Sequence, residues 1–212
     1  LIKTLHAKGV KPHLIADLVS SLNRRLLSHV ARLTLPPTQT DFALMILGSE
    51  GRKEQIIRTD QDNALIWQGD LDELHMREWS ERMHSALNRL GFPDCPGNIM
   101  MINPLWRQSL TNMINSAQDW MYHPTYESMM NLSILLDADT AVGNTQLTQE
   151  LRSKLYHLIA EQKQFLAHFA KSALQFDTPL GLFSQFITEK NDKHRYLDLK
   201  KGGIFPIVHG AR

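Results

Sequence analysis

Residues 44–67 read LMILGSEGRKEQIIRTDQDNALIW, and this stretch decides the fold. The stretch begins in an apolar run that has the length of a buried strand. A turn at Gly48-Ser49 and a charged connection follow, and the stretch ends in a second apolar run. The second run opens with Asp60-Gln61-Asp62, in which two acids alternate. Because successive side chains of a strand point to opposite faces, both acids are expected on the same side. The stretch therefore predicts two strands joined by a connection that starts with a glycine turn.

The residue types at the two ends of this connection suggest phosphate chemistry. Two carboxylates held together on one strand suit Mg²⁺, which proteins bind through one or two carboxylates together with substrate phosphates. A Gly-Ser turn directly after a strand presents backbone N–H groups and a hydroxyl to a phosphate, with no bulky side chain in the way. A phosphate-binding turn and a metal-binding pair of acids so near in sequence indicate phosphoryl or nucleotidyl transfer.

Composition limits the remaining classes of function. The chain has 212 residues, enough for one large or two small domains, and its 42% apolar and 21% charged residues are typical of a globular protein. A net charge of +1 without a long basic run gives no argument for a nucleic-acid partner. No apolar run approaches the roughly 18 residues of a membrane span. The lone Cys95 fits a reducing cytoplasm.

Strand patterns gather in the first half of the chain and helical patterns in the second. Helical periodicity predicts helices at residues 12–33 and 71–90, and an apolar run at residues 98–103 predicts a third strand. From Pro104 onward the periodicity is mostly helical. This segregation predicts an α+β fold with a helical part appended near residue 103.

Further motifs extend the pattern along the chain. The central string runs from Gly48 to Gln55 and from Thr59 to Ala64. The others are Asn103-Pro104-Leu105-Trp106-Arg107, Pro179-Leu180-Gly181-Leu182-Phe183 and the tail from Asp198 to Arg212. Together they closely resemble a bacterial, CBS-domain-associated family of nucleotidyltransferases akin to the N-terminal domain of protein-PII uridylyltransferase, within the superfamily of DNA polymerase β. The resemblance spans nearly the whole chain.

The resemblance implies a small polymerase-β-like nucleotidyltransferase sheet with helices, followed by a mostly helical bundle. It divides the chain into a connecting helix at residues 1–34, a nucleotidyltransferase domain at 35–103 and a helical substrate-binding domain at 104–212. Members of the family usually carry regulatory CBS domains upstream, often with a cyclic-nucleotide-binding-like domain. We therefore expect the chain, which begins at Leu1 rather than Met, to be a fragment of a longer protein.

The resemblance also assigns roles to residues at the matching positions. Gly48 and Ser49 would hold the β- and γ-phosphates of the nucleotide, and Asp60 and Asp62 would bind Mg²⁺ or Mn²⁺. Arg52 would help to neutralise phosphate. The remaining candidates are Gly51 and Thr59 at the nucleotide, and Lys200 and Arg212 in the tail that resembles the substrate-binding segment.

The superfamily commonly places a third carboxylate on the next strand, but residues 98–103 contain none. The nearest candidates are Asp94, just before this run, and Asp137, far downstream. Asp137 is our choice for this acid, either as a catalytic residue or as a wall of the site. A site with only two acids would bind nucleotide and transfer it poorly.

These expectations combine into a leading hypothesis and two alternatives. The leading one is a metal-dependent nucleotidyltransferase that moves UMP or AMP from an NTP to an acceptor, a regulatory protein in a signal-transduction context. The second is a catalytically weak or inactive nucleotide sensor, an output or dimerisation module for the upstream CBS domains, which would act as a homodimer. The third is transfer to a small molecule or to RNA, and the balanced charge weighs against RNA.

Overall fold

The computed structural model describes residues 1–36, 41–57, 60–69 and 73–162, and nearer the C-terminus residues 165–167, 169, 188–190, 195–199, 203–204, 207–208 and 210. The chain divides into two compact units that alternate along the sequence. The first consists of residues 1–117 and 137–155, and the second of residues 118–136 and 156–212. A four-stranded sheet lies wholly within the first unit.

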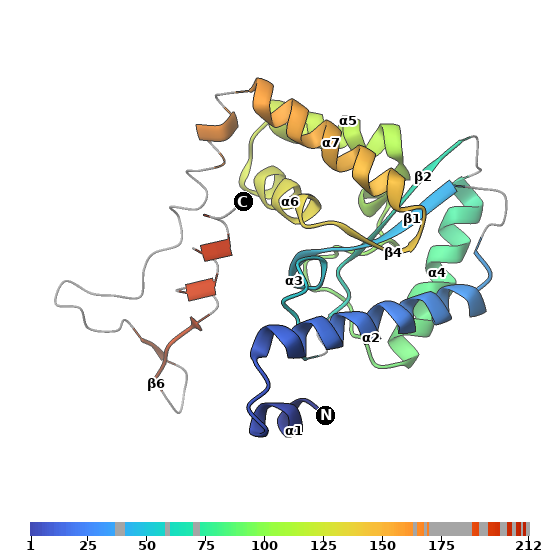
Figure 1. Cartoon of the computed structure of the whole chain (residues 1–212). Helices are drawn as coiled ribbons and strands as arrows, with labels where there is room; N and C mark the ends of the chain where they lie inside the picture. Colours follow the sequence, from blue (N-terminus) through green and yellow to red (C-terminus); the bar gives the residue numbers. More distant parts are fainter. Residues whose placement is uncertain are drawn as a thin grey trace. The chain divides into compact units, whose positions relative to one another are not determined.

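A four-stranded mixed sheet forms the centre of the first unit (Figure 1). Its strands are β1 (Asp41–Ile46), β2 (Asn63–Gln68), β3 (Arg107–Ser109) and β4 (Asp139–Gly143), in the spatial order β3-β2-β1-β4. β1 pairs antiparallel with β2 and β4, and β2 pairs parallel with β3. In the β1–β2 register Ile46 faces Asn63. The residues that follow β1 and those that precede β2 therefore meet at one end of the sheet.

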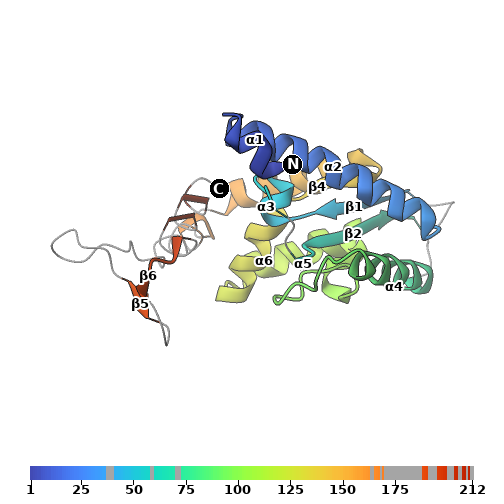
Figure 2. The same cartoon turned by 90° about the horizontal axis from the view of Figure 1, so that it is seen from below.

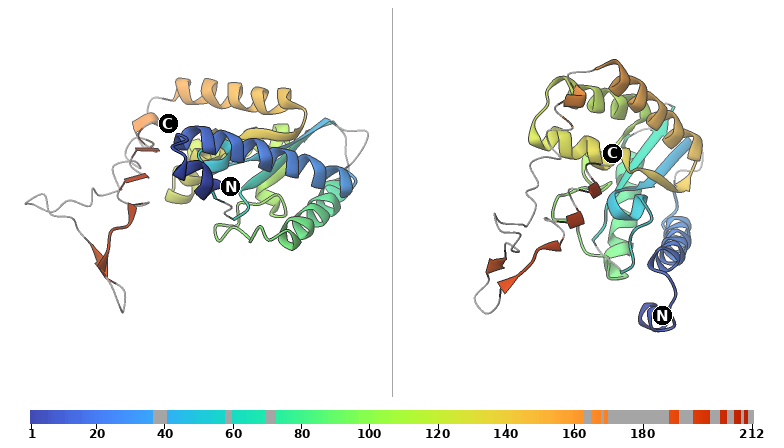
Figure 3. Two further views of the ribbon diagram at one scale, coloured as in Figure 1. Left: turned by 60° about the horizontal axis from the view of Figure 1, so that its bottom comes forward. Right: turned by 60° about the vertical axis from the view of Figure 1, so that its left-hand side comes forward.

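Helices account for most of the remaining described structure. They are α1 (Ile2–Ala7), α2 (Pro12–Leu33), α3 (Gly48–Gly51), α4 (Glu73–Arg89), α5 (Leu110–Tyr122), α6 (Tyr126–Leu136) and α7 (Thr145–Glu161), with a 3₁₀ helix η1 (Pro104–Trp106). A two-stranded sheet pairs β5 (Glu189–Lys190) with β6 (Arg195–Tyr196). At the N-terminus α1 leads directly into α2 (Figure 3). In the part of the chain that the structure describes, no helix has the length and apolar character needed to cross a membrane.

The core of the first unit packs α2 and α4 with the strands β1 and β2 (Figure 2). Both helices carry apolar residues at helical spacing, and this stripe is the side that they bury. The buried cluster comprises Leu27, Val30 and Ala31 of α2, Leu44 and Ile46 of β1, Leu65 and Trp67 of β2, Met76, Trp79, Met83 and Leu87 of α4, and Met101 from the segment before η1. The alternate strand residues Ala43, Met45, Ala64 and Ile66 are buried as well, so both faces of these two strands are covered.

The structure confirms the predicted α+β fold and corrects one of its strands. The helices expected at residues 12–33 and 71–90 correspond to α2 and α4. The strand expected at residues 98–103 is wrong, because these residues form turns and irregular structure. Periodicity could not exclude this error, since a short apolar run fits several conformations. The sheet is instead completed by β4, and the domain limits near residue 103 stay a prediction.

Candidate functional site

The turn that follows β1 is held against the segment that precedes β2. The backbone N–H of Leu47 donates to the carbonyl oxygen of Asp62 at 3.0 Å. Gly48 has a φ of +55°, a conformation that favours glycine, and a Cβ at this residue would lie 3.3 Å from Oδ2 of Asp62. Because Gly48 has no side chain, the turn and the carboxylate can approach each other closely.

Gln61, between the two acids, anchors this segment to α4 and to the residues that follow it. Its side chain is buried, and its Nε2 donates to Oδ1 of Asn88 at 2.9 Å and to the carbonyl oxygen of Phe92 at 3.0 Å. In an extended segment, neighbouring side chains point to opposite sides. Of the two acids, Asp62 is the one whose carboxylate lies against the turn at Gly48.

Asp60 and Asp62 lie just before β2 rather than within it, because β2 begins at Asn63. A carboxylate oxygen of each and the Sγ of Cys95 all lie within 4.8 Å of one another. Among the described residues, these three form the group that could hold a metal ion. The structure thus brings together the two acids that the sequence proposed as metal ligands and adds a cysteine beside them.

Cys95 differs chemically from the two acids. Burial raises the pKa of its thiol to about 11, and a hydrogen bond with Asp62 acts in the same direction. Without a bound metal the thiol is therefore protonated at neutral pH. The carboxylate oxygens of Asp60 and Asp62 are hard donors that fit Mg²⁺ or Mn²⁺, whereas the sulfur of a cysteine is a soft donor that suits other metals.

The carboxylate of Glu50 in α3, which the sequence did not single out, lies near these acids without belonging to the group that could hold a metal ion. Glu50 lines a cavity of about 20 Å³ together with Asp60 and Asp62. That volume holds roughly one water molecule or a bare ion, so a nucleotide would have to lie outside it. Burial raises the pKa of the Glu50 carboxyl; a hydrogen bond with Asn23 and the charge of Arg24 oppose the shift, and the charge of Asp62 adds to it.

Arg52 is held by two carboxylates. Its Nε and Nη2 donate to Oε2 of Glu54 at 2.9 and 2.8 Å, and its Nη1 donates to Oδ2 of Asp137. The side chain of Asp137 is only 4% exposed. Asp137 thus contacts Arg52 and does not belong to the group formed by the acids near β2. Both residues, predicted separately for the nucleotide and for the third acid, form one ion pair.

Gly51 closes α3 against the start of β4. A Cβ at this residue would lie 2.2 Å from the carbonyl oxygen of Asp137 and 3.0 Å from that of Ile46. Both neighbours are backbone atoms and cannot rotate away as a side chain could. The structure therefore gives Gly51 a close-packing function at the site, where the sequence had assigned it to the nucleotide.

Of the other residues predicted for the site, the structure describes Ser49. Ser49 is half-buried in α3, and its carbonyl oxygen accepts the N–H of Glu54 at 2.8 Å. Thr59, Lys200 and Arg212 lie outside the described residues. Their predicted contacts with nucleotide and substrate stay predictions.

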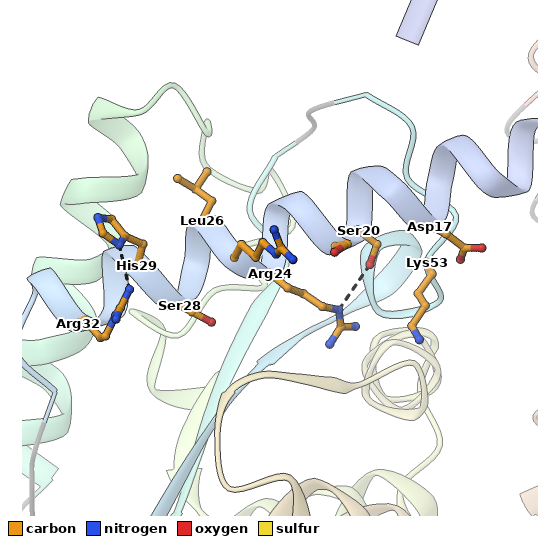
Figure 4. Close-up of a pocket in the computed structure, with 10 residues that line it drawn as sticks. Asp17, Ser20, Arg24, Leu26, Ser28, His29, Arg32 and Lys53 are labelled. Atoms are coloured by element: carbon orange, nitrogen blue, oxygen red, sulfur yellow. Dashed lines mark hydrogen bonds between the residues drawn. The ribbon is translucent and has the colours of Figure 1, made fainter. Parts of the chain in front are cut away.

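A larger hollow, an open groove of about 850 Å³, runs along α2 (Figure 4), and Glu50, Asp60 and Asp62 are not among the residues that line it. Its lining is mostly basic and hydroxylic: Asp17, Ser20, Ser21, Arg24, Arg25, Leu26, Ser28, His29, Arg32 and Lys53. Several of these groups are engaged with the protein itself, since Arg24 bonds to Oδ2 of Asp139 at 2.7 Å and Arg32 bonds to His29 at 3.0 Å. Asp17 is the one carboxylate in this lining. The groove therefore lacks the paired acids that a metal site requires.

Replacing Arg52 by Met is expected to lower the free energy of unfolding by about 2 kcal/mol, because the buried carboxylate of Asp137 loses its cation. Arg52 is 22% exposed, so solvent screens part of the interaction and limits the loss. Denaturant unfolding at neutral pH measures the change. Arg77→Met, which breaks an exposed pair with Glu81, is the control and should cost less than about 0.5 kcal/mol. Equal stability of the two variants would contradict the prediction.

Comparison with known protein families gives two matches. Residues 1–127, more than half of the 212-residue chain, match the family model described as "Putative nucleotidyltransferase DUF294". Residues 163–212 match the model described as "Putative nucleotidyltransferase substrate binding domain". A search among curated proteins found no match. The first match contains the whole stretch from β1 to β2.

Proposed function

The chain belongs to the DUF294 nucleotidyltransferase family, and from this premise we propose that it transfers a nucleoside monophosphate from an NTP to an acceptor hydroxyl. One observation carries the proposal. The glycine turn after β1 lies against Asp62, and the Asp62 carboxylate lies with that of Asp60 in a group able to hold a divalent metal. A phosphate-binding turn and a pair of hard ligands at one point are what such a transfer needs.

The residues of the chain would divide the work of the reaction. The backbone N–H groups of Gly48 and Ser49 would bind the β- and γ-phosphates, and Asp60 and Asp62 would hold Mg²⁺ or Mn²⁺. When bound, the metal supplies positive charge that stabilises the triphosphate as its negative charge shifts toward the leaving group. The acceptor oxygen forms a bond to the α-phosphorus, the bond from this phosphorus to the β-phosphate oxygen breaks, pyrophosphate leaves and the acceptor proton passes to solvent. Catalysis would rest mainly on positioning and charge.

The finer features of the proposal follow from the resemblance to protein-PII uridylyltransferase. The transferred group is UMP or AMP, and the acceptor is a regulatory protein in a signalling pathway. Upstream CBS domains would control the activity, and the lone cysteine fits a location in the cytoplasm. Lys200 and Arg212, together with Thr59, would contribute to binding of substrate and nucleotide.

A second candidate function is nucleotide sensing without efficient transfer, in a homodimeric output module. The observation that favours it is the composition of the metal-binding group. Among the described residues this group contains two carboxylates and a protonated thiol, while Asp137 is paired with Arg52. A sensor of this kind would bind NTP and metal and would release almost no pyrophosphate.

The two functions are separated by a turnover experiment on the full chain. The protein is incubated with each of the four NTPs, with Mg²⁺ or Mn²⁺, and with acceptors that range from small regulatory proteins to simple hydroxyl compounds. We expect pyrophosphate release and labelling of an acceptor with UTP or ATP, because the site combines a phosphate-binding turn with a pair of metal-binding acids. The doubly substituted Asp60→Asn, Asp62→Asn protein is the blank. Binding of NTP without pyrophosphate release above this blank would overturn the transferase and leave the sensor.

A further inference from the structure

We propose that the basic groove along α2 is the docking site for an acidic segment of the acceptor protein. The basic groove is the open hollow of about 850 Å³ whose lining includes Arg24, Arg25, His29, Arg32 and Lys53 (Figure 4). The inference rests on the proposed function, because it concerns the acceptor of the same transfer. It names the chemical class of that acceptor, which the metal site and the phosphate-binding turn leave open.

The basic groove gathers positive charge, although the whole chain is nearly neutral. The net charge of the chain is +1, whereas the described lining of the groove carries four cationic side chains, three arginines and a lysine, against the one carboxylate of Asp17. Cations gathered in a hollow create a positive potential that attracts an anionic partner and speeds its encounter. The electrostatics of the groove therefore favour an acidic ligand.

Three of these four cations are available to a partner. Arg24 is already paired, since its Nη2 donates to Oδ2 of Asp139 at 2.7 Å. Within the described residues, by contrast, no carboxylate pairs with Arg25, Arg32 or Lys53, and all three side chains are exposed. A carboxylate-rich segment would supply the partners that these three side chains lack in the described structure.

The length of the basic groove suits an extended segment of chain. Asp17 and Arg32 are the first and the last of its lining residues on α2. The helix rises 1.5 Å per residue, so the part between them is about 22 Å long. An extended peptide advances about 3.3 Å per residue, so roughly seven residues would cover this length. A single small anion would fill only a fraction of it.

The chemistry of the lining favours a peptide over a nucleic acid. Ser20, Ser21 and Ser28 add hydroxyl groups, which can bond to carboxylates and to peptide groups. Single-stranded nucleic acids bind with their bases stacked on aromatic side chains. Among the described lining residues the one ring is that of His29, and it already contacts Arg32 at 3.0 Å. The groove thus offers charge and hydrogen bonds and no platform for a base.

The basic groove borders the turn at which the transfer would take place. Lys53 belongs to its lining and follows α3 by two residues, and the N–H of Lys53 donates to the carbonyl oxygen of Glu50 at 3.0 Å. Arg24 contacts Asp139, which faces Ile46, the last residue of β1, in the β1–β4 pairing. A segment bound along α2 would therefore bring its neighbouring residues, and an acceptor hydroxyl among them, toward the phosphate-binding turn.

The test is a titration of the full chain, followed by fluorescence anisotropy, with fluorescein-labelled heptaglutamate as the probe. Salt is kept at about 50 mM, because exposed charges are screened more strongly at higher ionic strength. We expect saturable binding that is weakened at least about tenfold in the doubly substituted Arg25→Gln, Arg32→Gln protein. The matched control is Arg77→Gln, Arg89→Gln, which removes the same charge from exposed positions of α4 and should leave the affinity within about twofold.

Two further probes identify the class of ligand. Labelled heptalysine has the same length and the opposite charge, so it should not bind. A labelled single-stranded heptathymidylate should bind at least about tenfold more weakly than heptaglutamate, because the lining has no stacking platform. Tighter binding of the oligonucleotide than of the acidic peptide would overturn the proposal and assign the basic groove to nucleic acid.

The outcomes separate the inference from the function on which it rests. No binding of heptaglutamate, or equal binding by the two doubly substituted proteins, would overturn the docking site. Pyrophosphate release with a simple hydroxyl compound would be unaffected, since such an acceptor does not need the groove. Conversely, no pyrophosphate release with any acceptor, together with the expected loss of peptide binding, would overturn the transfer and leave the groove as a site for an acidic partner.

Thermal unfolding of both doubly substituted proteins shows whether the substitutions act on the fold. We expect both midpoints to match that of the wild type, because Arg25 and Arg32 are exposed. If the groove variant is less stable, Arg25→Lys, Arg32→Lys decides, since it keeps both charges. Recovered binding of heptaglutamate by this variant supports the proposal, and binding that stays lost would overturn it.

Discussion

Replacement of Asp62 by Asn is expected to lower the rate of pyrophosphate release by about 10³-fold or more while the protein remains folded. Asp62 is the residue at which the two halves of the site meet, since Gly48 packs on its carboxylate and Asp60 lies beside it. Loss of its charge weakens the metal site, and metal stabilisation of a phosphoryl transition state contributes several kcal/mol, or about three decades in rate. Initial rates at saturating NTP and Mg²⁺ measure the effect.

The stability of this variant should not follow its activity. Asp62 is half-exposed, and its charge is unfavourable for the nearby Glu50, so the amide should leave the midpoint of thermal unfolding unchanged or slightly higher without metal. Asp17→Asn makes the same chemical change at an exposed position of α2 and should alter neither quantity. Retention of more than about a tenth of the wild-type rate by Asp62→Asn would contradict the assignment of this residue as a metal ligand.

Replacement of Gly51 by Ala is expected to lower the free energy of unfolding by about 3 kcal/mol or more. The added Cβ would lie 2.2 Å from a backbone oxygen of Asp137, far inside the contact distance of a carbon and an oxygen atom. Relief requires that α3 move away from the start of β4, so nucleotide and metal binding should fall as well. Denaturant unfolding gives the stability, and a titration with a fluorescent NTP analogue gives the binding.

The matched control for Gly51→Ala is Gly203→Ala. A Cβ at Gly203 meets no atom within 4 Å, so the chemical change is the same and the contact is absent. We expect its free energy of unfolding to stay within about 0.5 kcal/mol of the wild type. A Gly51→Ala protein as stable as this control would show that the approach of α3 to β4 is looser than the structure describes.

The parts of the fold that were predictable are those that depend on short-range patterns. Two apolar runs of strand length and a Gly-Ser turn between them gave β1 and β2, and helical periodicity gave α2 and α4. The alternation in Asp60-Gln61-Asp62 implied that the two acids share a side, and their carboxylates do lie together. Each of these inferences uses residues that are near neighbours in the chain.

The parts that were not predictable depend on contacts between distant segments. β4 joins the sheet by pairing with β1, and its residues carry no strand signal strong enough to stand out from the helical pattern around them. The apolar run at residues 98–103 has the sequence pattern of a strand, but in the structure its backbone forms hydrogen bonds with Asn63. Only the tertiary structure decides between a pairing strand and a buried turn.

The candidate site shows the same division. Glu50 stands between Ser49 and Gly51, and no residue next to it in sequence indicates that it is buried; in the structure Asn23 and Arg24 of α2 are its partners. Cys95 has no sequence neighbour that suggests a functional position, yet it lies beside Asp62. Both placements arise from packing around the end of the sheet, which a residue pattern along one segment does not record.

The register of β1 against β2 has a consequence for how this site tolerates change. Ile46 faces Asn63 in the β1–β2 pairing. The hydrogen bond from the Leu47 N–H to the carbonyl oxygen of Asp62 joins the two ends of the connection next to the strands. An insertion among residues 53–57 would lengthen the connection and leave this hydrogen bond in place. An insertion of one residue within either strand would shift the pairing and disturb the alignment of the turn with Asp62. Length variation in relatives of this chain should therefore gather in the connection and spare the strands that frame it.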